Sequence, residues 1–176
     1  MARELERLGV HALVLSAGFV SKAPMAVMRG AMPLRTLAYY MDGRKFWWLK
    51  ALVRGFGRLM IPTVPYKDAY FLDDAKAFRA AVSLPLIYVG GMVSRAGMEE
   101  VLAAGFDALQ MARALVRDTD FVNKLQSGEV ERSECRHSNY CIGRMYTLQM
   151  RCNHCAGELP PSLRREIEKA EKRWSR

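Results

Sequence analysis

The feature that most limits how this chain can fold is a pair of apolar strand patterns separated by one short helix pattern. The strand patterns are SLPLIYVGG, residues 83–91, and DALQMAR, residues 107–113. Between them, Ser94 is suited to cap a helix and Gly105 to end it. A strand, a helix and a strand within this distance predict a right-handed βαβ unit with two parallel strands. The sequence therefore indicates the α/β class.

A third strand pattern extends this unit. The run ALVLSA, residues 12–17, is almost wholly apolar, which is typical of a parallel strand covered on both faces. A helix is expected over residues 73–82, beginning at Asp73 or Asp74. Another is expected to end at Gly9.

The link from the first strand to residue 73 is long for a single connection. It contains the loop FVSKAPMAVMRGAMP, residues 19–33, and a helical pattern around residues 43–57. Long loops on α/β frameworks often carry functional residues. After the third strand, residues 118–128 predict a short capped helix.

Two strands end in residues suited to bind phosphate. Gly90 and Gly91 follow one strand, while Ala112 and Arg113 follow the next. Parallel α/β units bind ligands at the carboxyl ends of their strands, and glycines let backbone N–H groups approach a phosphate closely. Arg113 could add a charge-assisted contact. A glycine pair is also typical of a tight turn, and an arginine of the surface, so both interpretations stay open.

The four cysteines, Cys135, Cys141, Cys152 and Cys155, all lie in one short segment. Such crowding in a chain with no other cysteine indicates metal or cluster ligation more than scattered disulfides. Cys152 and Cys155 have metal-ligand spacing, and His137 or His154 could complete a zinc site. Reduced cysteines that pack as small hydrophobic residues are the alternative.

The net charge of +9 favours a phosphate-bearing ligand or an acidic partner. Nucleic-acid binding is the weaker interpretation, because the basic residues are scattered and no RNA-binding motif is present, so we expect no nucleic-acid partner. The tail LRREIEKAEKRWSR mixes charges as an exposed helix does. The polar start and the lack of a long apolar run predict no signal peptide, no membrane partner and a cytoplasmic location.

Three stretches resemble the old yellow enzyme family of NADH:flavin oxidoreductases, in its C-terminal part. They are LVLSAGFVSKAPMAVMRGAMP, LPLIYVGGMVSRAGMEEVLAAGFDALQMARALVRDTDFV and CRHSNYCIGRMYTLQMRC, in family order. The resemblance implies strands six to eight of a TIM (β/α)8 barrel that binds FMN. It implies that the Gly90 and Gly91 N–H groups, Arg113 and the Ala112 backbone contact the FMN phosphate. Ser16 would lie near flavin or substrate, although a local hydrogen bond is the expected role of its hydroxyl.

The iron–sulfur branch of this family carries a similar cysteine block, with a cysteine where Ser138 stands here. The resemblance therefore implies three of the four ligands of a [4Fe–4S] cluster, Cys135, Cys141 and Cys152. The spacing of Cys152 and Cys155 offers Cys155 as the fourth thiolate. A lost cluster ranks first, a surviving or altered cluster second and a zinc site third.

The family's first five strands, with its substrate-orienting pair and proton-donating tyrosine, have no counterpart here, and Tyr88 is expected in the core. We therefore expect residues 1–131 to form part of a barrel, 132–157 the cysteine segment and 158–176 a charged helix. The resemblance implies NADH or NADPH as reductant and a small substrate with an activated alkene. A homo-oligomer or the missing barrel half would complete the fold, and the chain alone is expected to be inactive. A non-catalytic metal- or phosphate-binding module is the alternative.

Overall fold

A computed structural model describes residues 1–16, 29–30, 33–40, 47–60, 63–144, 150–155 and 159–174. The chain divides into two compact units. Unit 1 consists of Met1–Phe19 and Lys67–Ser133, and unit 2 consists of Val20–Tyr66 and Glu134–Arg176. Each unit has a hydrophobic cluster of its own. The three consecutive segments expected from the sequence are a different division, and the assignment of residues 1–131 to a barrel stays a prediction.

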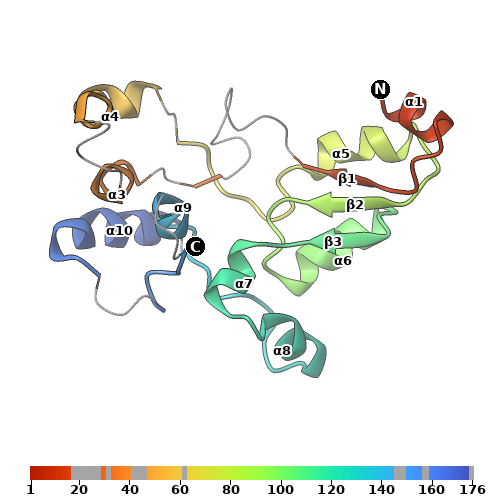
Figure 1. Ribbon diagram of the computed structural model, residues 1–176. Coiled ribbons are helices and arrows are strands. Elements are labelled where there is room, and N and C mark those ends of the chain that lie inside the picture. Colours follow the sequence, from red (N-terminus) through yellow and green to blue (C-terminus); the bar gives the residue numbers. More distant parts are fainter. Residues whose placement is uncertain are drawn as a thin grey trace. The chain divides into compact units, whose positions relative to one another are not determined.

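Unit 1 is a mixed α/β structure built on a small parallel sheet (Figure 1). The strands pair in the order β1-β2-β3, and Tyr88 in β2 is level with Leu15 in β1 and Leu109 in β3. All three predicted strands are therefore present, each shorter than its sequence pattern. The elements in chain order are α1 (Ala2–Arg7), β1 (Leu13–Leu15), α5 (Leu72–Arg79), β2 (Leu86–Val89), α6 (Arg95–Ala103), β3 (Ala108–Gln110), α7 (Arg113–Arg117) and α8 (Phe121–Ser127).

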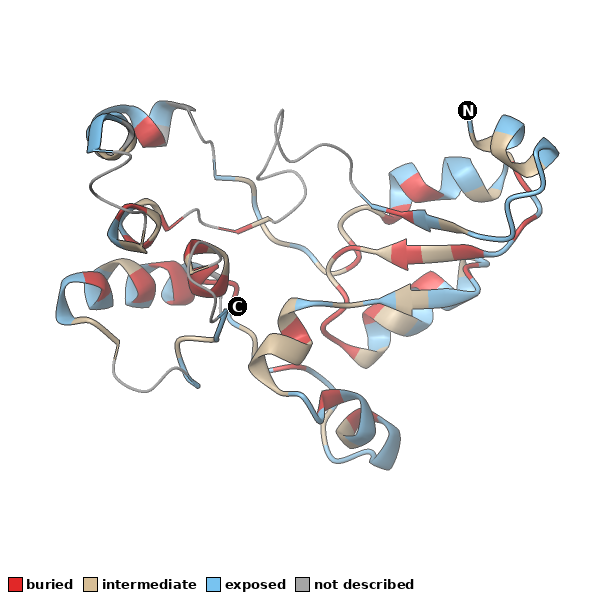
Figure 2. Cartoon of the chain, viewed as in Figure 1, coloured by how far each residue is buried: buried red, intermediate tan, exposed pale blue. Residues whose placement is uncertain are grey.

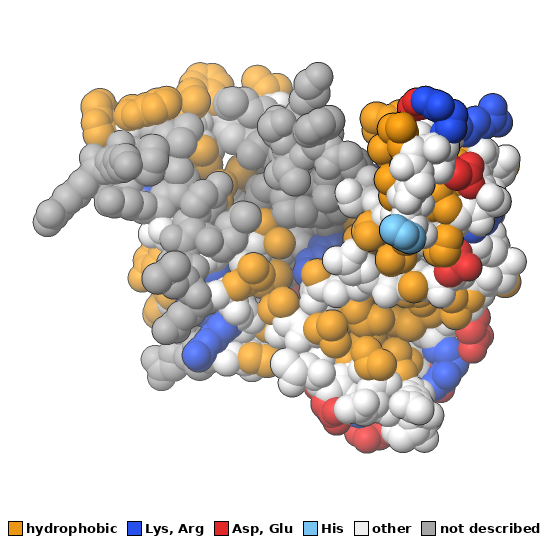
Figure 3. All heavy atoms as spheres, turned by 45° about the vertical axis from the view of Figure 1, so that its right-hand side comes forward, with side chains coloured by type: hydrophobic (Ala, Val, Ile, Leu, Met, Phe, Trp, Pro, Cys, Tyr) orange, Lys and Arg blue, Asp and Glu red, His pale blue; other side chains and the backbone are white. Residues whose placement is uncertain are grey.

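One face of this sheet is packed and the other is open. Leu15, Leu86 and Tyr88 lie in one buried cluster with Ala75 of α5 and Val101 of α6, so both helices cover the same face. Figure 1 shows both helices on one side of the strands. On the other face, Val14 is 53% exposed, and its neighbours in register are half-buried or exposed. Hydrophobic side chains gather on the surface of this unit in Figure 3. The expectation of strands covered on both faces is thus wrong for the described residues.

Local capping explains where the crossover helix begins and ends. The Ser94 hydroxyl accepts a hydrogen bond from the Gly97 N–H at 3.2 Å, which satisfies one of the first free amides of α6. Gly105 follows the last turn with φ +90°, a conformation that favours glycine. Both predictions are confirmed. Helix α5 begins at Leu72, one residue before the expected start, and Asp73 lies in its first turn.

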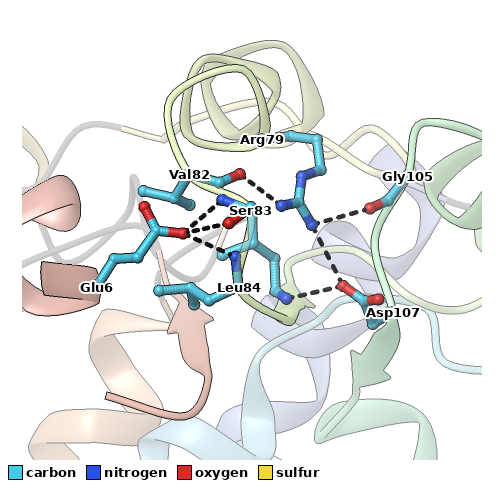
Figure 4. A network of polar contacts seen from close by, with 8 residues as sticks. Glu6, Arg79, Val82, Ser83, Leu84, Gly105 and Asp107 are labelled. Atoms are coloured by element: carbon cyan, nitrogen blue, oxygen red, sulfur yellow. Dashed lines mark hydrogen bonds and ion pairs between the residues drawn. The ribbon is translucent and has the colours of Figure 1, made fainter. Parts of the chain in front are cut away.

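A polar network ties together the loops at the amino ends of the strands (Figure 4). The Glu6 carboxylate accepts hydrogen bonds from the Ser83 amide and hydroxyl at 2.6 and 2.7 Å, and from the Leu84 amide at 3.0 Å. The Asp107 carboxylate accepts from the Leu86 amide at 2.9 Å and from Arg79 at 3.3 Å. The network lies at the edge opposite the predicted phosphate site, and it connects α1 and α5 to the residues that lead into β2 and β3.

The regular elements in the described part of unit 2 are helices, beside an isolated antiparallel bridge between Gly30 and Val64. The helices are α3 (Leu34–Tyr40), α4 (Trp47–Met60), α9 (Tyr140–Gly143) and α10 (Pro161–Trp174). Helix α4 overlaps the predicted helix around residues 43–57, whereas most of the loop over 19–33 lies outside the described residues. Among the helices in the described ranges, none has the length and apolarity needed to cross a lipid bilayer.

The C-terminal helix is not the uniformly exposed one that its charges predicted. Leu163 and Ile167 of α10 are buried against Tyr140 of α9, which gives the helix a packed face (Figure 2). Glu166 also reaches α3, where its two carboxylate oxygens accept hydrogen bonds from the Arg35 and Thr36 amides, each at 2.9 Å. These amides belong to the first turn of α3, so a residue distant in sequence caps this helix. Most charged residues of α10 are exposed, whereas Glu166 bonds to α3 and Glu171 is buried.

Candidate functional site

The predicted phosphate residues lie at the carboxyl ends of two neighbouring strands. Gly90 and Gly91 follow β2 directly, and Arg113 is the first residue of α7, three residues after β3 ends. Because β2 and β3 pair in parallel, with Val89 level with Gln110, these ends share one edge of the sheet. The fold thus brings together the two features that the sequence singled out, and their contact with a phosphate stays a prediction.

The glycine pair has a packing role that does not depend on a ligand. Gly91 has φ +74°, and a Cβ atom there would lie 2.9 Å from the Ala69 nitrogen and 3.0 Å from the Lys67 oxygen. Gly90 has φ +145°, and a Cβ atom there would lie 3.3 Å from the Tyr70 ring and 3.4 Å from the Phe71 Cβ atom. The chain that leads into α5 therefore packs directly against both glycines. Such a turn explains both glycines, which lie at the edge of the sheet where the sequence predicts a phosphate site.

An ion pair that the sequence analysis missed holds this chain in position. Arg132 donates to the two Asp68 carboxylate oxygens at 2.7 and 2.9 Å, and the Ser94 hydroxyl donates to Asp68 at 2.6 Å. The same Asp68 therefore connects the start of α6 with the chain that packs on Gly91. Asp68 and Arg132 are 64 residues apart, and no local pattern in the sequence pairs them.

Tyr88 is a core residue, as predicted. Its side chain is fully buried, and its hydroxyl oxygen accepts a hydrogen bond from the Phe71 N–H at 3.0 Å. Burial raises the pKa of Tyr88 to about 12. A hydroxyl that stays protonated and is enclosed in this way supports the start of α5.

Ser16 and His11 are both exposed, one after β1 and one before it. Ser16 follows the carboxyl end of β1, the edge strand that neighbours β2. His11 lies before the amino end of the same strand, away from the edge predicted to bind phosphate. A flavin- or substrate-facing role for Ser16 therefore stays a prediction.

The structure does not gather the four cysteines into a metal centre. Cys141 is buried, Cys135 and Cys152 are half-buried and Cys155 is exposed, and all four are thiols. Within the described ranges, which include all four, no three His, Cys, Asp or Glu residues lie close enough to hold a metal ion. The Cys135 Sγ atom instead lies 3.5 Å from the His137 Nδ1 atom. As arranged here, the cysteines do not fit a four-thiolate cluster, and the cluster and zinc predictions gain no support.

Ser138 stands where the iron–sulfur branch has a cysteine, and here it bonds to the side chain of Asn153. Its hydroxyl donates to the Asn153 side-chain oxygen at 3.3 Å, and the Cys152 thiol lies 3.7 Å from the same oxygen. The residues between Cys152 and Cys155 are therefore connected to the segment before α9.

Comparison with known proteins links the chain to a reductase. It is 34% identical over 148 residues to a 4,4'-dithiodibutanoate disulfide reductase of Rhodococcus erythropolis. The matched region is 84% of this chain and 36% of that protein, so the chain spans about a third of the relative's length. No protein-family model and no solved structure matches the chain. The chain is thus homologous to part of an oxidoreductase, and membership of the old yellow enzyme family stays a prediction.

Proposed function

We propose that this chain is the C-terminal portion of an FMN-dependent oxidoreductase of the old yellow enzyme type, and that it supplies the FMN phosphate site. The observation that carries the proposal is the shared carboxyl edge of β2 and β3, because the glycine pair and Arg113 follow these two neighbouring parallel strands. The homology to a reductase along most of the chain favours redox chemistry over a non-catalytic module.

The open sheet face supports a barrel as the complete fold. In a TIM barrel, one face of each strand is covered by helices and the other points into the barrel interior. Here α5 and α6 cover one face, while Val14 on the other face is 53% exposed. Strands β1 to β3 would then be barrel strands six to eight. The five further strands would belong to a longer parent protein, to a partner chain or to a homo-oligomer.

Each residue of the proposed site has a specific role. The Gly90 and Gly91 N–H groups would donate to phosphate oxygens, and the Arg113 guanidinium would neutralise part of the phosphate charge. The Ala112 backbone would lie beside it. Bound FMN would supply hydride transfer from NADH or NADPH to the substrate, while this chain holds the cofactor's phosphate end.

Two substrate classes are compatible with this proposal. The family resemblance suggests an activated alkene, whereas the name of the Rhodococcus relative suggests an organic disulfide. The second class rests on a homologue that matches most of the chain. It deserves equal weight in an activity screen of the complete protein.

FMN binding tests the site directly. We would mix the purified chain with FMN or with riboflavin, which has the same ring system and no phosphate, and measure affinity by quenching of flavin fluorescence. Arg113→Ala should weaken FMN binding roughly 10- to 100-fold, because a hydrogen bond to a charged group contributes about 1.5–3 kcal/mol. Riboflavin binding should be weak and should not change in this variant.

Arg7→Ala is the matched control. It removes the same charge from α1, whose Glu6 contacts the amino-end loops of the sheet rather than the carboxyl edge. FMN affinity should stay at the wild-type value in this control. An equal loss of FMN affinity in both variants would show that Arg113 acts only through the net charge of the chain. Unchanged FMN affinity in Arg113→Ala would reject the phosphate assignment. If the wild-type chain binds FMN no better than riboflavin, the proposed site fails.

A further inference from the structure

The turn at Cys152–Cys155 in unit 2 is not used by the flavin proposal. We propose that Cys152 and Cys155 form a redox-active dithiol that reduces small organic disulfides by thiol–disulfide exchange. This inference does not rest on the proposed FMN site, because the exchange needs only the two thiols and the disulfide.

The backbone brings the two cysteines close enough to form a disulfide. The Cys155 N–H donates to the Cys152 carbonyl oxygen at 3.0 Å, which closes a four-residue turn. In such a turn the first and fourth Cα atoms lie within about 7 Å of each other. Disulfides join cysteines whose Cα atoms are about 4.4–6.8 Å apart. The two thiols can therefore be joined with little movement of the backbone.

The two residues between the cysteines are fixed by one carboxylate. The Asn153 side-chain amide donates to Glu171 Oε1 at 2.7 Å, and His154 Nε2 lies 2.8 Å from the same oxygen. Glu171 belongs to α10 and is only 8% exposed. Anchoring on a packed helix pre-organises the turn, so less conformational entropy is lost when the disulfide closes.

The two thiols differ in accessibility. Cys155 is exposed, whereas Cys152 is half-buried. This difference suits a mechanism in which an incoming disulfide meets Cys155 first and Cys152 acts second from within the turn. In the described segments, no third side chain joins the pair in a group that could hold a metal ion.

The reaction balances without a further co-reactant. The Cys155 sulfur attacks one sulfur of the substrate disulfide, whose S–S bond breaks and releases the first thiol. Cys152 then attacks the Cys155 sulfur of the mixed disulfide and releases the second thiol. The substrate gains two electrons and two protons, and the chain changes from a dithiol to an intramolecular disulfide. An external dithiol would return it to the reduced form.

Peptide mapping of the reduced full chain, free of flavin and nicotinamide, tests this inference. After reaction with bis(2-hydroxyethyl) disulfide and alkylation, trypsin should release CNHCAGELPPSLR, because Arg151 precedes this sequence and Arg164 ends it. This peptide holds Cys152 and Cys155 and no other cysteine, whereas Cys135 and Cys141 fall in separate peptides. We expect this peptide to carry no alkyl group and to be two hydrogens lighter than its reduced form, as an intramolecular disulfide requires. The peptides with Cys135 and Cys141 should both be alkylated.

Two serine variants separate the steps. Cys152→Ser should stop after the first step, retaining one mercaptoethanol adduct on Cys155 and forming no cross-link. Cys155→Ser should react with the disulfide at least about 10-fold more slowly than the wild-type chain, because its remaining thiol in the turn, Cys152, is less accessible. A wild-type chain that retains the adduct without closing, or a Cys155→Ser chain that reacts as fast as wild type, would overturn the inference. Because no flavin is present, either outcome leaves the FMN proposal to its own test.

Discussion

Replacing Gly91 with alanine should destabilise unit 1 strongly, whether or not a ligand binds there. At φ +74° a side chain costs about 1–2 kcal/mol, because Cβ crowds the following carbonyl oxygen. The new Cβ would also lie 2.9 Å from the Ala69 nitrogen and 3.0 Å from the Lys67 oxygen. Both are backbone atoms, and relieving such overpacking typically costs about 1–3 kcal/mol. The expected loss in free energy of unfolding is therefore about 2–5 kcal/mol.

Gly128→Ala is the matched control within the same unit. Gly128 ends α8 with φ +76°, and a Cβ atom there meets nothing within 4 Å. This variant should lose only the conformational part, about 1–2 kcal/mol. Equilibrium urea denaturation of both variants measures the difference, provided that the slope with denaturant concentration stays the same.

The difference between the two alanine variants isolates the clash with the chain before α5. Equal destabilisation would show that this chain moves aside freely, and would refute the packing role of Gly91. If Gly91→Ala also bound FMN poorly while remaining as stable as Gly128→Ala, the glycine would be required by the ligand alone.

Three further perturbations probe unit 1. Tyr88→Phe should lower the free energy of unfolding by about 1–3 kcal/mol in urea denaturation, because the Phe71 N–H loses its acceptor; an unchanged midpoint would contradict this. Hydrogen bonds from Ser83 lower the pKa of Glu6 below its ordinary 4.5, so its stabilisation is present above that value and is lost as pH falls through the lower folded-state pKa. Glu6→Gln should therefore be less stable than wild type at neutral pH, with a gap in thermal midpoint that closes on acidification; a constant gap would exclude this origin. Ser94→Ala should cost about 0.5–2 kcal/mol in denaturant unfolding through the lost cap of α6, and a neutral result would mean that water replaces the hydroxyl.

Local patterns in the sequence were enough to find the sheet and its crossover. Apolar runs predicted the three strands, and the residues that cap or end a helix marked the bounds of α6 at Ser94 and Gly105. These signals succeed because they depend on backbone geometry within a few residues. For the same reason, the sequence found the glycine pair and Arg113 at strand ends that proved to be neighbours.

Features that depend on long-range contacts were not predictable in this way. The Asp68–Arg132 pair joins residues 64 apart, and α10 has a buried face because Tyr140 and Tyr40, both distant in sequence, pack in the same cluster. The spacing of the cysteines suggested a shared metal, but their arrangement depends on how the segments around α9 and α10 fold. The spacing there also carries a second local signal, because two cysteines separated by two residues suit a turn that can close a disulfide.

The cap that Glu166 provides to α3 has a consequence for the order of events during synthesis. Arg35 and its capping carboxylate are 131 residues apart. At roughly 5–20 residues per second, the ribosome completes the start of α3 about 7 to 26 seconds before it adds Glu166. During that interval the first amides of α3 can bind only water or another transient partner. Residues 67–133 of unit 1 are synthesised within the same interval. The nascent chain therefore contains most of the sheet unit before the residue that caps α3 has been added.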